Sequence, residues 1–172
     1  PKPLIEVNKV PMFIEAVSSL PKTKEKLFVI NADKKDIIEE NLERYFEKDY
    51  KLISLDTVTD GQSTTTKVGI EKLINKDPIT LSSCDHALFY DMNNLTDILN
   101  EKNDLIVWVA KGYYSAIRNP EMYGWVNADK NDYIIKTAVK SVLNSPENDY
   151  VITGTFTFRN SQILEELIYA QK

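Results

Sequence analysis

Short apolar runs alternate with amphipathic segments through residues 10–110, and this alternation constrains the fold more than any other feature of the sequence. The apolar runs are rich in Ile, Val and Leu and lack polar alternation, which predicts strands buried on both faces. They lie at residues 26–30, 50–55, 78–83 and 104–110. Strands that alternate with helices form βαβ units, so the pattern predicts an α/β domain built on a mainly parallel sheet.

The segments around these runs carry helical patterns. Apolar residues of segment 34–46 share one helical face, with Glu and Lys opposite. These apolar residues are Ile38, Leu42, Tyr45 and Phe46. Further helices are expected at 10–20, where Pro11 suits the first turn, and at 93–102, where Asn or Thr can serve as the cap. A helix at 61–74 would begin poorly on polar residues and end well, with Leu73 and Ile74 in its apolar part.

The pattern changes after about residue 110. Residues 122–140 contain two runs of β-forming residues around "NADKND", which predicts a β-hairpin. Residues 150–158 predict another strand, in which Gly154 marks a bulge or a close approach by a ligand or another segment. A last helix should begin near Ser161. No repeat and no shift in composition marks a second domain, so a single domain over residues 1–172 is expected, with 42% hydrophobic residues to fill one core.

Composition excludes several partners. The net charge is −5 and no basic run occurs, which argues against nucleic acid as the main partner. No apolar run approaches the ~20 residues of a membrane span, so no membrane partner is expected. The single cysteine rules out an internal disulfide and fits a cytoplasmic protein. Nothing in the sequence decides between a monomer and an oligomer.

Polar residues follow each expected strand, at the edge of a parallel α/β sheet where ligands bind. They are Asn31 and Asp33, Asp56, Cys84 to His86, and Lys111. The loop "DGQSTTT" at 60–66 leads into the helix expected at 61–74, and the N–H groups of such a loop can hold an anion or a base edge. The same loop also suits an ordinary helix cap, because Asp60, Ser63 or Thr64 can accept hydrogen bonds from a first turn. It is not a Walker loop, since no Gly-Lys-Ser/Thr follows.

Asp85 stands where the third expected strand ends. A carboxylate at that edge suits Mg²⁺, which prefers one or two carboxylates together with phosphate oxygens. The alternative is that Asp85 caps the turn that follows. His86 is the only histidine, and without a triad partner it favours a surface or packing role. Cys84 favours the role of a small buried residue. The aromatic residues are expected to pack in the core and against the sheet, with stacking of one ring on a base or a sugar as the alternative. They are Trp108, Tyr113, Tyr114, Tyr123 and Trp125.

Five segments, taken in chain order, carry a family resemblance. They are "PKPLIEVNKVPM" (1–12), "TDGQSTTTKVG" (59–69), "SSCDHALF" (82–89), "MYGWVNADKNDYIIKTAVK" (122–140) and "ITGTFTFRNSQIL" (152–164). In this order they resemble the sugar-phosphate nucleotidyltransferases, or sugar-1-phosphate pyrophosphorylases. The resemblance implies a Rossmann-like, GT-A/nucleotidyltransferase fold, which is a three-layer sandwich around a mixed, mainly parallel sheet.

The resemblance also implies a reaction and roles for particular residues. An NTP and a sugar-1-phosphate would give an NDP-sugar and pyrophosphate, with Mg²⁺ as the cofactor. Lys2 matches the lysine that contacts the nucleotide phosphates, Asp85 the metal-binding aspartate, and Lys140 the lysine that contacts the sugar phosphate. The remaining implied residues are Gly61, Gln62 and Ser63 for the nucleotide, and Tyr123, Gly124, Thr153 and Gly154 for the sugar substrate.

Departures from the family pattern leave alternatives open. The family's Gly-rich loop, expected before Pro1, and its second metal-binding aspartate, expected after the last helix, are not in the sequence, so we expect a fragment that is incomplete at both ends. One alternative function is a GT-A glycosyltransferase, although its usual Asp-x-Asp is here Asp85-His86-Ala87. The other is a non-catalytic module that binds or senses sugar nucleotides.

Overall fold

The computed structural model describes residues 1–72 and 77–170, and the chain divides into two compact units. The first unit comprises residues 1–104 together with the segment from Phe158 onward. The second unit comprises Leu105–Thr157. The single domain expected over residues 1–172 stays a prediction.

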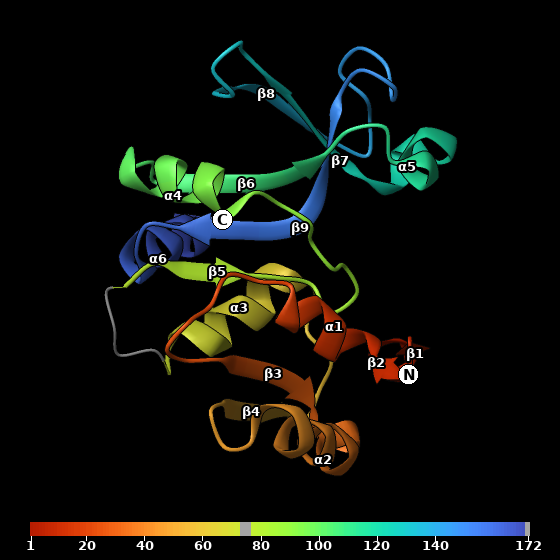
Figure 1. Cartoon of the computed structure of the whole chain (residues 1–172), viewed down its shortest axis with the longest axis vertical. Helices are drawn as coiled ribbons and strands as arrows, with labels where there is room; N and C mark the ends of the chain where they lie inside the picture. Colours follow the sequence, from red (N-terminus) through yellow and green to blue (C-terminus); the bar gives the residue numbers. More distant parts are fainter. Residues whose placement is uncertain (73–76, 171–172) are drawn as a thin grey trace. The chain divides into compact units, whose positions relative to one another are not determined.

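Strands and helices alternate in the first unit, as the sequence predicts (Figure 1). The strands are β1 (Glu6–Val7), β2 (Val10–Pro11), β3 (Leu27–Asn31), β4 (Lys51–Leu55) and β5 (Ile79–Leu81). The helices are α1 (Met12–Ser18), α2 (Lys35–Phe46), α3 (Gln62–Ile70), α4 (Met92–Asn100) and α6 (Ser161–Ala170), with 3-10 turns at Lys2–Leu4 and Ala32–Lys34. Within residues 1–72 and 77–170, no helix has the length and apolar content needed to cross a membrane.

Strands β3 and β4 form the parallel βαβ unit that the sequence predicts, with α2 as the connection. They pair in parallel from Leu27 opposite Lys51 to Asn31 opposite Leu55. Helices α1 and α2 supply the buried core on one face of this pair, and the predicted face of α2 is confirmed. The buried members are Phe13, Ile14, Ile38 and Leu42, with Phe28, Ile30, Tyr45 and Phe46 packed against them.

Helix α3 covers the other face of β3. A Cβ atom added at Gly69 would lie 3.4 Å from Val29 Cγ2 and 3.5 Å from Leu27 Cδ2, so α3 approaches the strand closely. Leu27 and Val29 therefore face α3, while Phe28 and Ile30 face the α1 and α2 core, as the two-residue period of a strand requires. The result is a helix–sheet–helix arrangement around β3.

Three local expectations need correction. The strands are half-buried rather than buried on both faces, because residues 27–30 of β3 and most of β6 (Leu105–Ala110) keep intermediate exposure. Pro11 occupies the N-cap position of α1, one residue before the first turn in which it was expected. Helix α3 already begins at Gln62, within the stretch expected to start poorly, and Leu73 and Ile74 lie outside the described residues.

The second unit is built on antiparallel pairing. Its elements are β6, α5 (Tyr114–Arg118), a 3-10 turn at Pro120–Met122, β7 (Gly124–Ala128), β8 (Ile134–Val139) and β9 (Tyr150–Phe158) up to its last residue. Strand β7 pairs with β8 and with β9, and β6 also pairs with β9. The predicted hairpin at 122–140 and the strand at 150–158 are therefore confirmed.

Trp125 anchors the core of the second unit. It is 1% exposed, packs with Ala116 and Val151, and donates its indole N–H to the carbonyl of Pro120 at 2.9 Å. The packing role expected for the aromatic residues holds for Trp125 but not for Tyr114, which is 73% exposed, while Tyr113 is 41% exposed and packs edge-on against Tyr123. Both tyrosines lie at the beginning of α5, outside the strands of the sheet.

The cap of α4 is Asp91, not the Asn or Thr expected from the sequence. Its carboxylate accepts a hydrogen bond from Asn93 N at 2.8 Å. We expect Asp91→Ala to lower the free energy of unfolding by about 1 kcal/mol, because a first-turn N–H loses its partner. Urea denaturation at pH 7 measures this. The matched control is Asp97→Ala, an exposed position inside the same helix, which should leave stability unchanged or slightly raised because Ala is the better helix former. Equal losses for both variants would contradict the capping role.

Candidate functional site

Lys2 and Asp85 are in direct contact, although 83 residues separate them in the sequence. The Lys2 ammonium donates a hydrogen bond to Asp85 Oδ2. Lys2 lies in the 3-10 turn near the beginning of the chain, and Asp85 follows β5, which ends at Leu81. The Lys2 side chain is 66% exposed and that of Asp85 only 17%, so the carboxylate is set into the surface and the ammonium reaches it from solvent.

His86 and Ser83 complete the surroundings of this carboxylate. His86 Nδ1 lies 2.9 Å from Asp85 Oδ1 and 3.1 Å from Ser83 Oγ. Burial would raise the pKa of Asp85, but hydrogen bonds from Lys2 and Ser83 and the charges of His86 and Lys2 outweigh it, so the pKa lies below its usual value. The carboxylate is therefore ionised and can only accept, which makes His86 Nδ1 the donor.

Sequence reasoning missed this part of the arrangement. It assigned His86 a surface or packing role, whereas the ring hydrogen-bonds the candidate metal ligand. A signal existed in the spacing of "SCDH", because a histidine directly after a strand-end aspartate can reach back to it. Cys84 was also misjudged. It is an exposed residue, because it lies past the end of β5 in the turn that carries Asp85. Its thiol is nevertheless partly shielded from water, and this desolvation together with the negative charge of Asp85 raises the pKa of Cys84.

The donor set at Asp85 fits a metal ion that arrives with a phosphate ligand. Within residues 1–72 and 77–170, no group of three or more His, Cys, Asp or Glu side chains is placed to hold a metal ion. Mg²⁺ commonly binds through one or two carboxylates, with the remaining ligands from substrate phosphates and water. Asp85 can supply one such carboxylate ligand. The described residues therefore fit a site that substrate phosphates and water complete, and not a site made of protein ligands alone.

The loop at 59–66 lies at the beginning of α3. Gly61 takes the cap position in an extended conformation and has no side chain to accept from the first turn of α3. The hydroxyl of Thr65 donates to the Gly61 carbonyl at 3.2 Å and lies 2.5 Å from that of Thr59, which ties the loop to the helix. None of the three residues expected to cap α3 takes the cap position.

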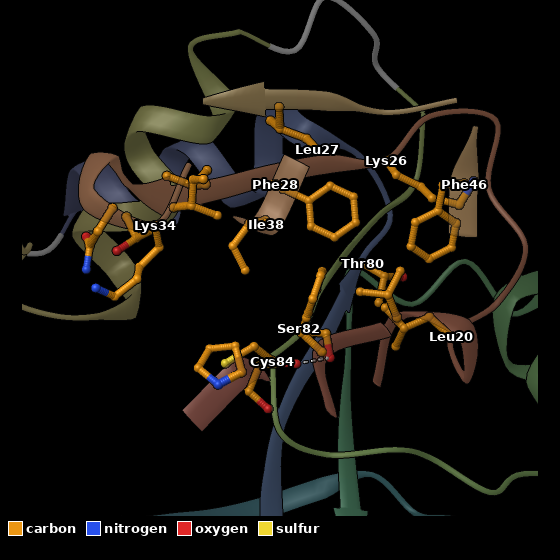
Figure 2. A pocket seen from close by; sticks show the side chains of 18 of the residues that line it. Leu20, Lys26, Leu27, Phe28, Lys34, Ile38, Phe46, Thr80, Ser82 and Cys84 are labelled. Carbon is orange, nitrogen blue, oxygen red and sulfur yellow. Dashed lines mark hydrogen bonds between the residues drawn. The ribbon is translucent and has the colours of Figure 1, made fainter. Parts of the chain in front are cut away.

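A large cavity of about 930 Å³ joins these segments within the first unit. Its lining includes Pro1 and Pro3 on either side of Lys2, Thr59 and Thr65 of the loop, and Ser83 and Cys84 next to Asp85. Figure 2 shows Ser82 and Cys84 on one side of this cavity and Phe28 on another. Three segments singled out in the sequence therefore border one hollow, beside the contact between Lys2 and Asp85.

The remaining predicted site residues belong to the second unit. Lys140 is exposed, follows β8, has φ of 58° and donates its backbone N–H to the Tyr123 carbonyl at 2.8 Å. Tyr123 packs edge-on against Tyr113. Thr153 donates its hydroxyl to the Trp108 carbonyl at 2.9 Å. Lys140 and Tyr123 are thus brought together through their backbones.

Glycine suits positions 124 and 154 of this set for different structural reasons. A Cβ atom at Gly124 would lie 3.1 Å from Ile152 Cδ1, so the glycine allows β7 and β9 to pack closely. Gly154 has φ of 81°, a left-handed conformation that favours glycine inside a strand. The bulge or close approach expected at Gly154 from the sequence stays a prediction.

Comparisons with known proteins define the class of fold. No protein-family model and no curated protein matches the chain. Solved structures match it over nearly its full length, and they show an α/β, Rossmann-like fold of the nucleotidyltransferase type. The Rossmann-like fold expected from the resemblance is therefore confirmed.

Three particular structures share this fold. A UDP-glucose pyrophosphorylase complexed with UDP-glucose matches with a TM-score of 0.71 and 16% identity, over 100% of this chain and 72% of that one. HddC from Yersinia pseudotuberculosis matches with a TM-score of 0.70 and 15% identity, over 96% and 70%. The 4-diphosphocytidyl-2C-methyl-D-erythritolsynthase from Anaerococcus prevotii DSM 20548 matches with a TM-score of 0.62 and 16% identity, over 100% and 71%. At these identities the likeness concerns the fold.

Proposed function

We propose that this chain carries the nucleotide-binding part of a nucleotidyltransferase that joins an NTP and a sugar-1-phosphate into an NDP-sugar and pyrophosphate. The observation that carries the proposal is the contact between Lys2 and an ionised Asp85, at the end of a strand and beside a cavity that the 59–66 loop also lines. A cation and a carboxylate at such an edge suit the phosphates of a nucleotide and its metal ion. The fold shared with a UDP-glucose pyrophosphorylase supports the same class of reaction.

The proposed reaction needs positioning and charge neutralisation more than covalent help from the protein. An oxygen of the sugar-1-phosphate attacks the α-phosphorus of the NTP, the new O–P bond forms, and the bond to the β-phosphate oxygen breaks to release pyrophosphate. Lys2 turns from Asp85 to the triphosphate, which its exposure permits. The beginning of α3 at Gly61, Gln62 and Ser63 holds the base, and Lys140 of the second unit stays a proposal for the lysine that neutralises the sugar phosphate.

Magnesium would enter this site together with the nucleotide. Asp85 would hold it through its carboxylate, and the contact of His86 with Oδ1 orients that carboxylate. Bound there, Mg²⁺ neutralises charge that develops on the phosphate oxygens. Tyr123, Gly124, Thr153 and Gly154 stay proposals for the sugar side of the substrate.

The test is a coupled assay of pyrophosphate release with a panel of NTPs and sugar-1-phosphates, with and without Mg²⁺. We expect turnover for at least one pair and none without the metal. Isothermal calorimetry with each NTP, with and without Mg²⁺, accompanies the assay. Nucleotide binding without turnover would favour the non-catalytic binding module, and the absence of both binding and turnover with every pair would refute the proposal.

A further inference from the structure

Strand β8 lies at an edge of the sheet of the second unit (Figure 1). Among the residues that the structure describes, its only strand partner is β7, with which it forms the hairpin. Every residue from Tyr133 to Lys140 is exposed except Ala138, which is half-buried. A strand with one unpaired edge and exposed side chains on both faces is open to pairing with another strand.

The exposed side chains of this strand are mostly apolar. Residues 133–139 read YIIKTAV, a run of β-branched and aromatic residues that favours a paired strand. Ile135 is 66% exposed and Val139 is 77% exposed, and Tyr133 and Ile134 are exposed as well. Proteins commonly protect an edge strand with charged side chains, and Lys136 is the one charged residue within β8. An apolar surface of this kind marks a candidate interaction site.

The backbone of β8 presents hydrogen-bonding groups at its open edge. Lys140 donates its backbone N–H to the Tyr123 carbonyl at 2.8 Å, so this N–H points toward β7. In an antiparallel ladder, the backbone groups of alternate residues point to the same edge. The groups of Thr137 and Val139 therefore point away from β7. The irregularity in the register of the hairpin lies nearer its turn, so this part of β8 is regular.

Opposite charges stand at the two ends of the exposed run. Asp132 precedes the run and Lys140 follows it, and both residues are exposed. Neither side chain forms an ion pair with another residue of the described part of the chain. When two copies of such a run pair antiparallel, the acidic end of each copy lies beside the basic end of the other. The run is therefore complementary in charge to a second copy of itself.

We propose that β8 is a homodimerisation surface, on which the β8 strands of two copies of this chain pair antiparallel about a two-fold axis near Lys136. The outward backbone groups of Thr137 and Val139 extend the sheet of one copy into the other, as in other cases of strand addition. Asp132 of each copy lies near Lys140 of the other copy. Such a contact uses the same surface on both copies, which is the commonest symmetry of soluble oligomers.

Other arrangements of two strands suit these charges less well. A parallel pair would bring Asp132 beside Asp132 and Lys140 beside Lys140, and like charges on neighbouring strands are destabilising. In the antiparallel pair only Lys136 approaches its own copy, and its exposed side chain can extend into solvent. One short strand from each copy gives a small interface, so the dimer is reversible and forms at high protein concentration.

The experiment measures the mass of the protein in solution by sedimentation at low salt, without nucleotide or sugar phosphate. For the unaltered protein we expect the average mass to rise from monomer toward dimer between about 10 μM and about 1 mM, as suits a small interface. Asp132→Lys and Lys140→Asp should each raise the dissociation constant at least about tenfold, because like charges then meet at both ends. The double variant should restore it to within about threefold of the unaltered value, because the two changes are coupled.

A second pair of variants tests the backbone contact. Thr137→Pro removes an N–H from the open edge, where proline is tolerated, and should keep the protein monomeric over the whole range. Its matched control is Thr137→Val, which keeps the N–H and should dimerise like the unaltered protein. The NMR signal of the Trp125 indole N–H, which donates to the Pro120 carbonyl, reports that the unit stays folded. If Thr137→Pro disturbs this signal, the charge variants decide.

Three results would overturn the proposal. The first is an unaltered protein that stays monomeric up to about 1 mM, the upper end of the range that a small interface calls for. The second is equal association of Thr137→Pro and Thr137→Val while both are folded, which would exclude pairing through this edge. The third is a double charge variant that associates no better than the single variants, which would exclude the antiparallel pair. Because no substrate is present, each result is independent of the proposed function.

Discussion

Replacing Asp85 by Asn is expected to lower turnover in the pyrophosphate-release assay by about 100-fold and to remove the Mg²⁺ dependence of nucleotide binding. Asn keeps the size of the side chain and removes its charge. The pKa of Asp85 lies below its usual value despite its burial, because Lys2, Ser83 and His86 favour the ionised form, so the charge is present at neutral pH. Isothermal calorimetry of the NTP, with and without Mg²⁺, measures the binding part.

Stability should change little in Asp85→Asn, which separates a functional loss from unfolding. The partner of Asp85 is a lysine that is 66% exposed, and an ion pair open to solvent contributes at most about 1 kcal/mol. The matched control is Asp33→Asn. Asp33 follows strand β3, lines the cavity beside Asp85 and pairs with Lys34. Equal Mg²⁺ dependence of binding in Asp85→Asn and the unaltered protein would exclude Asp85 as a metal ligand.

Elements with a strong local pattern were predicted well from the sequence. The face of α2 that carries Ile38 and Leu42, the parallel pairing of β3 with β4, and the hairpin of β7 and β8 all follow from periodicity and turn residues. The beginning of α3 was predicted less well, because intrinsic propensity ranks its threonines low. In the structure the hydroxyls of Thr65 and Thr66 donate to the carbonyls of Gly61 and Gln62, within the helix itself.

Contacts between distant segments could not be derived from local pattern. The sequence positions of Lys2 and Asp85 say nothing about their distance in space, and the family resemblance suggested separate roles for them rather than an ion pair. The hydrogen bond of His86 to Asp85 was missed because a lone histidine was weighed only against a catalytic triad.

Replacing Asp149, a buried polar residue of the second unit, is expected to cause a large loss of stability. It is 2% exposed, and its carboxylate accepts hydrogen bonds from Leu143 N at 2.8 Å, Asn144 N at 2.7 Å and Asn144 Nδ2 at 2.8 Å. These bonds close the segment between β8 and β9, which begins at Lys140. We expect Asp149→Ala to lower the free energy of unfolding at pH 7 by about 3 kcal/mol, because buried N–H groups lose their acceptor. Urea denaturation measures the change.

The effect of Asp149 should also depend on pH. Burial alone would raise the pKa of Asp149. The hydrogen bonds from Asn144, Leu143 and the backbone of Ser145 lower this pKa by more than burial raises it, so the folded-state pKa lies below the unfolded value of about 3.9. The stability from this lowered pKa is therefore present above about pH 4 and lost as the pH falls through the folded-state pKa. The stability of Asp149→Ala should lack this part of the acid dependence. The difference in free energy of unfolding between the variant and the unaltered protein should therefore narrow below about pH 4.

The control for Asp149 is Asp129→Ala in the turn of the hairpin. Asp129 also accepts two backbone hydrogen bonds, from Asn131 N at 2.8 Å and Tyr133 N at 3.0 Å, but it is exposed. Water can replace the lost acceptor there, so we expect Asp129→Ala to lower the free energy of unfolding by less than about 1 kcal/mol. If both variants lose the same stability, or if the acid dependence of Asp149→Ala equals that of the unaltered protein, the buried carboxylate does not hold this segment. The burial of Asp149, and not its number of hydrogen bonds, is what the comparison isolates.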